Sequence, residues 1–405
     1  MIAYRSLVCA LALFAFPALA QTEVTPAEPI NIPVDSPAFA FSPGNWVGDT
    51  GRTGSKFRQT WNSGAYFRFN WSTTHTIPSA TLHFDTSGYD TSYRLPSLTL
   101  NVDGFWTARV PCTSEVKLPR LDGAGQHLLT VYLSTSEERD RWGTAQASGK
   151  NVVRLTGITL DEQSKPGPAV LSPQWALEIG DSITEGIGAD NGAPDNLSDY
   201  SYFVGQALQS RGMEYGVSAC GWSGWLQRGD NPPGDVLPYY MITGSTNGSG
   251  GVYDDSLSRW NKIDSRTSLL DSRGHLSAYG GTGQEPSIIT INYGTNDALR
   301  GANTSDTQAS IIQSLAALRR AAPNAKIFVI IPFGQFNANL LKAGVEAHKK
   351  AHKREKNLFV IDLGESVARS LNSNGYWGDL HPNQRAHAVF ASQIVAAIDR
   401  HLDKR

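Results

Sequence analysis

The chain has 405 residues, with 35 lysines and arginines against 37 aspartates and glutamates. This length accommodates two domains with separate hydrophobic cores, or one large α/β domain with decorations. The balanced charge gives no electrostatic basis for binding nucleic acid or an anionic membrane surface, and no apolar run beyond the N-terminal region is long enough to predict a membrane span.

The first twenty residues have the pattern of a secretory signal peptide. Arg5 precedes an apolar stretch from Leu7 to Phe16, and small residues at 18–20 stand before Gln21. The apolar stretch is too short to cross a bilayer, and the small residues suit cleavage after Ala20. We therefore expect an exported protein, periplasmic or secreted; a buried N-terminal helix is the alternative.

Only two cysteines remain after such cleavage, because Cys9 lies in the signal region. In an exported protein Cys112 and Cys220 could form one disulfide. Two buried thiols are the favoured alternative, since free cysteine is among the most buried residue types.

Short runs of alternating apolar residues extend from about residue 40 to residue 160. In residues 67–71, FRFNW, the aromatic side chains share one face, and residues 98–102 repeat the pattern before an Asp-Gly turn. The apolar phase changes around Gly157, which predicts a bulge. These features predict a β-sandwich over residues 21–160, which is a candidate carbohydrate-binding domain.

A polar, proline-rich stretch, residues 161–173, is predicted to be the linker to a second domain at residues 174–405. There, apolar runs and helical patterns alternate, which predicts a parallel sheet covered on both faces. The expected strands are at 175–179, 287–292, 327–331 and 358–361, and the expected helices at 198–211, 306–321, 338–355 and 383–402. Residues 226–284 lack this alternation, and long loops of this kind are usually functional walls or lids.

Four polar segments occupy places that one active site could share: residues 180–182, 218–225, 294–297 and 378–383. In an open parallel sheet, ligands bind beyond the carboxyl ends of the strands, where such segments meet. A serine becomes nucleophilic when a histidine removes its proton, so Ser182 and His381 form the candidate pair. The N–H groups of Ser182 and Gly221 and the amide of Asn296 are candidate oxyanion donors.

These segments resemble the SGNH, or GDSL-like, hydrolase superfamily over about residues 174–402. The matching blocks are GDSITEG at 180–186, SACGWSG at 218–224, GTND at 294–297 and DLHPN at 379–383. The resemblance implies a flavodoxin-like three-layer α/β/α domain that hydrolyses esters without a metal or organic cofactor. STSEERD at 134–140 and VVRLTGITLDE at 152–162 make the first domain similar to the β-domain, jelly-roll-like, of carbohydrate esterase family two, whose members deacetylate xylan and glucomannan.

One position departs from the superfamily pattern. The superfamily places an aspartate three residues before its histidine, whereas Gly378 stands there in this chain and Asp379 is two residues before. Either Asp379 still reaches His381, or a backbone carbonyl near residues 377–378 orients the imidazole, as the resemblance to carbohydrate esterase family two implies. The need for an orienting group does not decide between them.

Three tryptophans lie within or beside these blocks. Trp222, Trp225 and Trp377 are candidate substrate-binding residues because aromatic faces suit stacking on sugar rings, although large aromatics also fill cores. Asp181 and Asp297 are expected to hold their loops by accepting backbone N–H groups. The other histidines are irregularly spaced, so no zinc site is predicted.

The sequence therefore predicts an exported serine esterase that removes acyl groups, acetyl in particular, from an acylated polysaccharide or oligosaccharide. Two alternatives on the same scaffold are a lipid or aryl esterase and an acyltransferase. A third is a carbohydrate-binding protein with an inactive hydrolase domain. The sequence does not name the polysaccharide, the acylated position or the oligomeric state.

Overall fold

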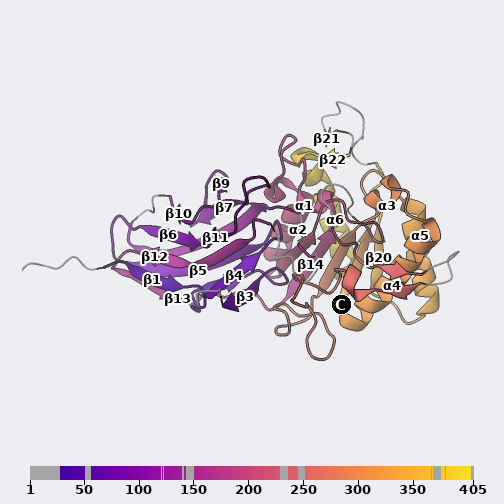
Figure 1. The fold of residues 1–405 in the computed structure, drawn as a ribbon, viewed down its shortest axis with the longest axis horizontal. Coiled ribbons are helices and arrows are strands. Elements are labelled where there is room, and N and C mark those ends of the chain that lie inside the picture. The colour runs from indigo at the N-terminus through magenta and orange to yellow at the C-terminus, as the bar shows by residue number, and fades with distance from the viewer. Residues whose placement is uncertain are drawn as a thin grey trace, which may run out of the picture.

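The computed structural model describes residues 28–50, 56–119, 121, 123–138, 141–142, 150–228, 236–244, 251–365, 367, 375–378 and 380–402. Figure 1 shows two domains: an N-terminal domain of strands only, and a C-terminal domain in which helices flank a central sheet. The predicted signal peptide, residues 1–20, and Asp379 lie outside the described residues.

The N-terminal domain consists of two antiparallel sheets, with strand orders β10-β6-β12-β4-β3 and β13-β5-β11-β7-β8; β1 adds to β12, β2 to β5 and β9 to β7. The strands are β1 (Ile30–Pro33), β2 (Phe39–Phe41), β3 (Val47–Thr50), β4 (Lys56–Thr60), β5 (Tyr66–Thr73), β6 (Ala80–Phe84), β7 (Ser97–Val102), β8 (Phe105–Trp106), β9 (Val110–Pro111), β10 (Glu115–Lys117), β11 (Gly125–Thr135), β12 (Val153–Leu160) and β13 (Ser164–Gly167).

The predicted sandwich is confirmed, and its core follows from the two-residue period. Phe67, Phe69 and Trp71 alternate along β5 and are buried between the sheets. The predicted bulge is also present, because the register between β12 and β6 shifts between Leu155 and Gly157.

The linker prediction was wrong for part of residues 161–173. Ser164–Gly167 forms β13, which pairs with Asn70–Thr73 of β5 at the edge of the sheet. Pro166 is tolerated there because an edge strand can leave one side unpaired, so the missing N–H breaks no ladder. The polar composition that indicated a linker is equally compatible with an edge strand.

The C-terminal domain contains a five-stranded parallel sheet of order β15-β14-β18-β19-β20. Its strands are β14 (Trp175–Gly180), β15 (Glu214–Ala219), β18 (Ile288–Asn292), β19 (Lys326–Ile330) and β20 (Leu358–Ile361); β16 (Ile242–Thr243) pairs with β17 (Val252–Tyr253), and β21 (Tyr376–Trp377) with β22 (His381–Pro382). The helices are α1 (Ser182–Glu185), α2 (Tyr200–Gln209), α3 (Thr295–Leu299), α4 (Thr304–Ala321), α5 (Ala338–Ala351), α6 (Gln384–Leu402) and the 3₁₀ turns η1 (Asn196–Ser198) and η2 (Asp255–Leu257).

Helices cover both faces of this sheet, which confirms the predicted α/β/α sandwich. Apolar residues of α4 and α5 pack with one face, and those of α2 and α6 pack with the other. Asp199 caps α2 by accepting the N–H of Tyr202, and Asn383 accepts the N–H of Ala386 at the start of α6. The last helix was predicted at residues 383–402, and α6 begins one residue later, at Gln384.

The described part of residues 226–284 packs on the sheet rather than forming a lid. Tyr239, Ile263 and Leu276 are buried in the same core as α4. The Arg259 guanidinium donates to the carbonyl oxygen of Gly180, the last residue of β14, at 3.0 Å.

The two domains contact each other through buried polar groups. The Tyr66 hydroxyl donates to Glu214 at 2.6 Å, the Arg68 guanidinium pairs with the same carboxylate at 2.9 Å, and the Asn45 amide donates to the carbonyl oxygen of Val217 at 2.6 Å.

Cys112 and Cys220 are both buried and form no disulfide, which confirms the expectation of two thiols.

Candidate active site

The side chains of Ser182 and His381 meet at the carboxyl end of the parallel sheet. Ser182 is the first residue of α1, directly after β14, and His381 lies in the short strand β22. The Nε2 atom of His381 lies 2.9 Å from the Oγ atom of Ser182, although 199 positions separate the residues in the chain. This is the contact that a nucleophile and its general base require.

Two glycines allow the backbone to pack closely around Ser182 and His381. A Cβ atom on Gly180 would lie 1.8 Å from the Thr184 hydroxyl oxygen, which is incompatible with the turn from β14 into α1. Gly188 has a φ of +76°, and a Cβ there would lie 3.0 Å from the Cβ of His381. Gly188 thus lets its loop pack directly against the catalytic imidazole.

Burial keeps His381 neutral at neutral pH. Desolvation of the imidazolium form lowers the pKa of His381 to about 4. The ring can therefore accept the proton of Ser182 over most of the pH range.

Two of the three expected oxyanion donors, the Asn296 amide and the Ser182 N–H, remain candidates for that role. The Asn296 amide donates to the carbonyl oxygen of Ser223 at 3.0 Å and has only a long contact, 3.5 Å, with Asp181. One of its N–H groups is therefore weakly engaged. Ser182 begins a helix, so its own N–H has no acceptor within α1.

Gly221 is arranged differently from what the sequence led us to expect. Its N–H donates to the Oε2 atom of Glu185 at 2.8 Å. Glu185 also forms an ion pair with Arg141, and both side chains are buried. In this arrangement the Gly221 N–H stabilises the turn after β15, and an oxyanion would have to compete with Glu185 for it.

The two aspartates of the motifs hold the loops, as expected. Asp297 accepts the N–H groups of Trp225, Leu226 and Gln227 at 2.9, 3.0 and 2.9 Å. Asp181 accepts the N–H of Ile183 at 3.0 Å, and burial raises the pKa of Asp181 to about 7. These bonds fix the segments that carry Ser182 and Asn296.

The three candidate tryptophans occupy different environments. Trp222 is 38% exposed, with the Arg300 guanidinium 5.0 Å from its ring, and Trp377 is 56% exposed against Gly192. Trp225 has no exposed surface and packs against Tyr239 and Tyr293, so the expectation of a substrate-binding role for it is corrected. Its ring is part of the core.

Sequence reasoning missed the group that supports the Gly221 turn. Arg141 comes from the segment after β11, in the other domain, and its guanidinium donates to the carbonyl oxygen of Ala219 at 2.6 Å. Glu185 is one of two acidic residues in the block GDSITEG, and this charge could have drawn attention to it. No sequence signal links Glu185 to Arg141, because their contact depends on how the domains dock.

The described residues contain neither a cluster of metal ligands nor a membrane-spanning helix. Among the described residues, no group of three or more His, Cys, Asp or Glu side chains is arranged to hold a metal ion. None of the described helices is both long enough and apolar enough to span a membrane.

A parallel α/β/α sheet that presents a serine, its histidine base and an amide donor at one edge defines a serine hydrolase. The chain matches the model of the GDSL-like lipase/acylhydrolase family over residues 179–389, more than half of its length, and belongs to that family. It is a carboxylic ester hydrolase. A comparison with curated protein sequences finds no match.

Solved structures share both domains of the chain. A family two carbohydrate esterase from Clostridium thermocellum in complex with cellohexaose aligns with 90% of this chain and 99% of its own, with a TM-score of 0.60 and 17% identity. An acetyl xylan esterase from the rumen bacterium Butyrivibrio proteoclasticus gives coverages of 92% and 99%, a TM-score of 0.63 and 14% identity. A salicylyl-acyltransferase from a tetracycline biosynthetic pathway gives coverages of 92% and 98%, a TM-score of 0.57 and 13% identity. At such identities the likeness establishes the fold.

Proposed function

We propose that the protein is an exported serine esterase that removes acetyl groups from a polysaccharide or oligosaccharide. The 2.9 Å contact between the Ser182 hydroxyl and a buried, neutral His381 carries the proposal, because it provides an activated nucleophile. The signal-peptide pattern of residues 1–20 supports export.

In the proposed reaction, Ser182 attacks the ester carbonyl while His381 takes the hydroxyl proton. The Asn296 amide and the Ser182 N–H stabilise the oxyanion of the tetrahedral intermediate. His381 then protonates the departing sugar oxygen, which leaves an acetyl group on Ser182. A water molecule, deprotonated by the same histidine, attacks this acyl-enzyme and releases acetate.

The exposed tryptophans near Gly221 and His381 support the proposal of a carbohydrate substrate. Trp222 directly follows Gly221, and Trp377 pairs with His381 across β21 and β22. Both side chains are partly exposed, and indole faces suit stacking on sugar rings. Two structural neighbours point the same way, since one was solved with cellohexaose and another is named as an acetyl xylan esterase.

The test is acetate release by the full-length chain and its Ser182→Ala variant from acetylated xylan, acetylated glucomannan and 4-nitrophenyl acetate. We expect the variant to lose about 10⁴- to 10⁶-fold in kcat while its circular dichroism spectrum is unchanged. Full activity of Ser182→Ala would rule out the mechanism. Preference for long-chain or aryl esters, with no acetate released from any polysaccharide, would favour a lipid or aryl esterase.

An acyltransferase is the second candidate, since the acyltransferase neighbour covers 92% of the chain at a TM-score of 0.57. The same acyl-enzyme would pass its acyl group to a sugar hydroxyl instead of water. Adding an unacetylated oligosaccharide and following acetylated product by mass spectrometry separates the two. A hydrolase gives acetate under these conditions, and a transferase gives acetylated oligosaccharide.

A further inference from the structure

Two consecutive aromatic residues form the edge strand β8 of the N-terminal domain, and both are exposed. Phe105 is 71% exposed and Trp106 is 50% exposed. The Trp106 ring stacks on Tyr132 with the ring centroids 5.6 Å apart, which accounts for its position. Exposed aromatic rings on an open sheet edge promote association with other chains, so the more exposed ring, Phe105, is better accounted for by a ligand that covers it.

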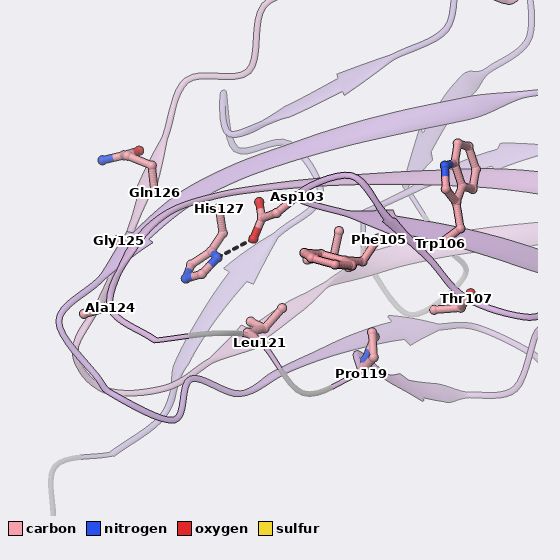
Figure 2. A pocket seen from close by; sticks show the side chains of 11 residues that line it. Asp103, Phe105, Trp106, Thr107, Pro119, Leu121, Ala124, Gly125, Gln126 and His127 are labelled. Carbon is pink, nitrogen blue, oxygen red and sulfur yellow. Dashed lines mark hydrogen bonds and ion pairs between the residues drawn. The ribbon is translucent and has the colours of Figure 1, made fainter.

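Phe105 borders a groove of about 740 Å³ between the β7–β8 hairpin and a facing segment that includes Pro119, Leu121 and residues 124–127. Figure 2 shows the Phe105 ring on the side of Leu121, whereas the ring of Trp106, which also lines the groove, points away from Leu121. Val102 and Leu121 provide apolar surface, and Asp103, Thr107 and Gln126 provide polar groups. A groove of this size and mixed lining matches small-molecule binding sites in proteins.

The polar groups of the groove are held in place before any ligand binds. One carboxylate oxygen of Asp103 lies 2.7 Å from Nδ1 of His127, and the other accepts the N–H of Leu128 at 2.7 Å. Each carboxylate oxygen keeps a free lone pair. Thr107 accepts the N–H of Leu100 at 3.1 Å through its hydroxyl oxygen, so its O–H can still donate.

An exposed apolar ring next to fixed acceptors and a hydroxyl donor complements a sugar, which has an apolar C–H face and a rim of hydroxyl groups. We propose that this groove binds a neutral sugar unit of a polysaccharide, with Phe105 as the stacking platform and Asp103 as the principal acceptor. The link to catalysis rests on the proposed function, because the bound polysaccharide is the one that carries the ester.

The groove extends along the sandwich from near the domain interface. Phe105 pairs with Val102, which is level with Leu129, three residues along β11 from Tyr132; the Tyr132 ring contacts Tyr202 of the catalytic domain. Gly125, at the other end of the groove, is seven residues from Tyr132, about 23 Å at ~3.3 Å per residue. A polysaccharide is long enough to extend from the groove to the active site, and its capture at the groove raises the local ester concentration at Ser182.

The experiment separates binding from catalysis by using the full-length Ser182→Ala protein in affinity electrophoresis through gels containing xylan or glucomannan. We expect Phe105→Ala in this background to weaken retardation about tenfold. The matched control is Tyr279→Ala, which removes a similarly exposed ring, 45% accessible, from the other domain and should leave retardation unchanged.

Kinetics of the active enzyme provide the second measurement. Phe105→Ala should raise KM for the acetylated polymer severalfold with kcat unchanged, and should leave hydrolysis of 4-nitrophenyl acetate unaffected. The proposal would be overturned if Phe105→Ala were retarded as strongly as its parent, or if Tyr279→Ala lost as much retardation as Phe105→Ala. It would also be overturned if no polysaccharide retarded the protein and sedimentation showed a dimer that depends on Phe105. If a polysaccharide retards the protein but no polysaccharide releases acetate, the groove proposal is supported and the proposed function is contradicted.

Discussion

Arg141 of the N-terminal domain and Glu185 of the catalytic domain form a buried ion pair three residues after the nucleophile Ser182. The same guanidinium donates to the carbonyl oxygen of Ala219 at 2.6 Å, and Glu185 accepts the N–H of Gly221 at 2.8 Å. One cation thus fixes both ends of the turn that follows β15. The N-terminal domain therefore helps to hold the turn that carries Gly221.

We expect Arg141→Gln to reduce both stability and turnover. Removing the cation leaves the Glu185 carboxylate buried without its partner, which costs about 3–5 kcal/mol in the free energy of unfolding. A turn displaced by even about 1 Å can lower kcat up to ~100-fold. Urea unfolding and steady-state kinetics on 4-nitrophenyl acetate measure the two effects, and Arg141→Lys should recover part of kcat.

The matched control is Arg68→Gln, which breaks another ion pair between the same domains. Arg68 pairs with Glu214, the first residue of β15, whereas the Gly221 turn follows the last residue of that strand. We expect Arg68→Gln to lose about 1–3 kcal/mol of stability without a change in kcat. An equal fall in kcat in both variants would show that domain docking in general, and not Arg141, supports the site.

The pH dependence of hydrolysis follows from the burial of His381. Because its pKa is lowered to about 4, the ring is neutral above that pH and protonated below it. Only the neutral ring can accept the serine proton, so kcat/KM should stay level from neutral pH down to about 5 and fall as the pH drops through about 4. A pH–rate profile with 4-nitrophenyl acetate tests this. An acid limb near the ordinary histidine pKa would contradict it.

The Asn296 amide should contribute more to turnover than to folding, since its hydrogen bond to the Ser223 carbonyl oxygen is worth only about 1 kcal/mol. Asn296→Ala removes a donor to the developing oxyanion, and loss of one such donor lowers kcat about 10²- to 10³-fold. Steady-state kinetics on 4-nitrophenyl acetate provide the measurement. Asn191→Ala is the control, because that exposed amide contacts only the neighbouring Asp190 among the hydrogen bonds of the described residues. Comparable losses in the two variants would argue against an oxyanion role.

Much of the fold could be predicted because it depends on local patterns. The two-residue alternation of residues 67–71 and the helical spacing of residues 384–402 both reflect which face is buried, and burial determines the element. The meeting of Ser182 and His381 was also predictable, because strands of a parallel sheet end at the same edge.

The predictions that were wrong concern contacts that no local sequence pattern encodes. Residues 164–167 have a loop-like composition and form a strand because the edge of β5 is free to pair. Trp225 and Trp222 are three positions apart in one motif, yet only the packing of Tyr239 and Tyr293 decides that Trp225 is buried. The Gly221 N–H donates to Glu185, and Glu185 is held in turn by Arg141 of the other domain.

The group that orients His381 can be identified by comparing Asp379→Ala with His381→Ala. Trp377 pairs with His381 across β21 and β22, so the main chain of Trp377 lies alongside the histidine. A carbonyl there can hold the imidazole without a carboxylate, and we therefore expect Asp379→Ala to lose less than about tenfold in kcat, against about 10²- to 10⁴-fold for His381→Ala. Hydrolysis of 4-nitrophenyl acetate measures both. A loss near 10⁴-fold in Asp379→Ala, the size seen when a triad aspartate is replaced, would instead assign the orienting role to Asp379.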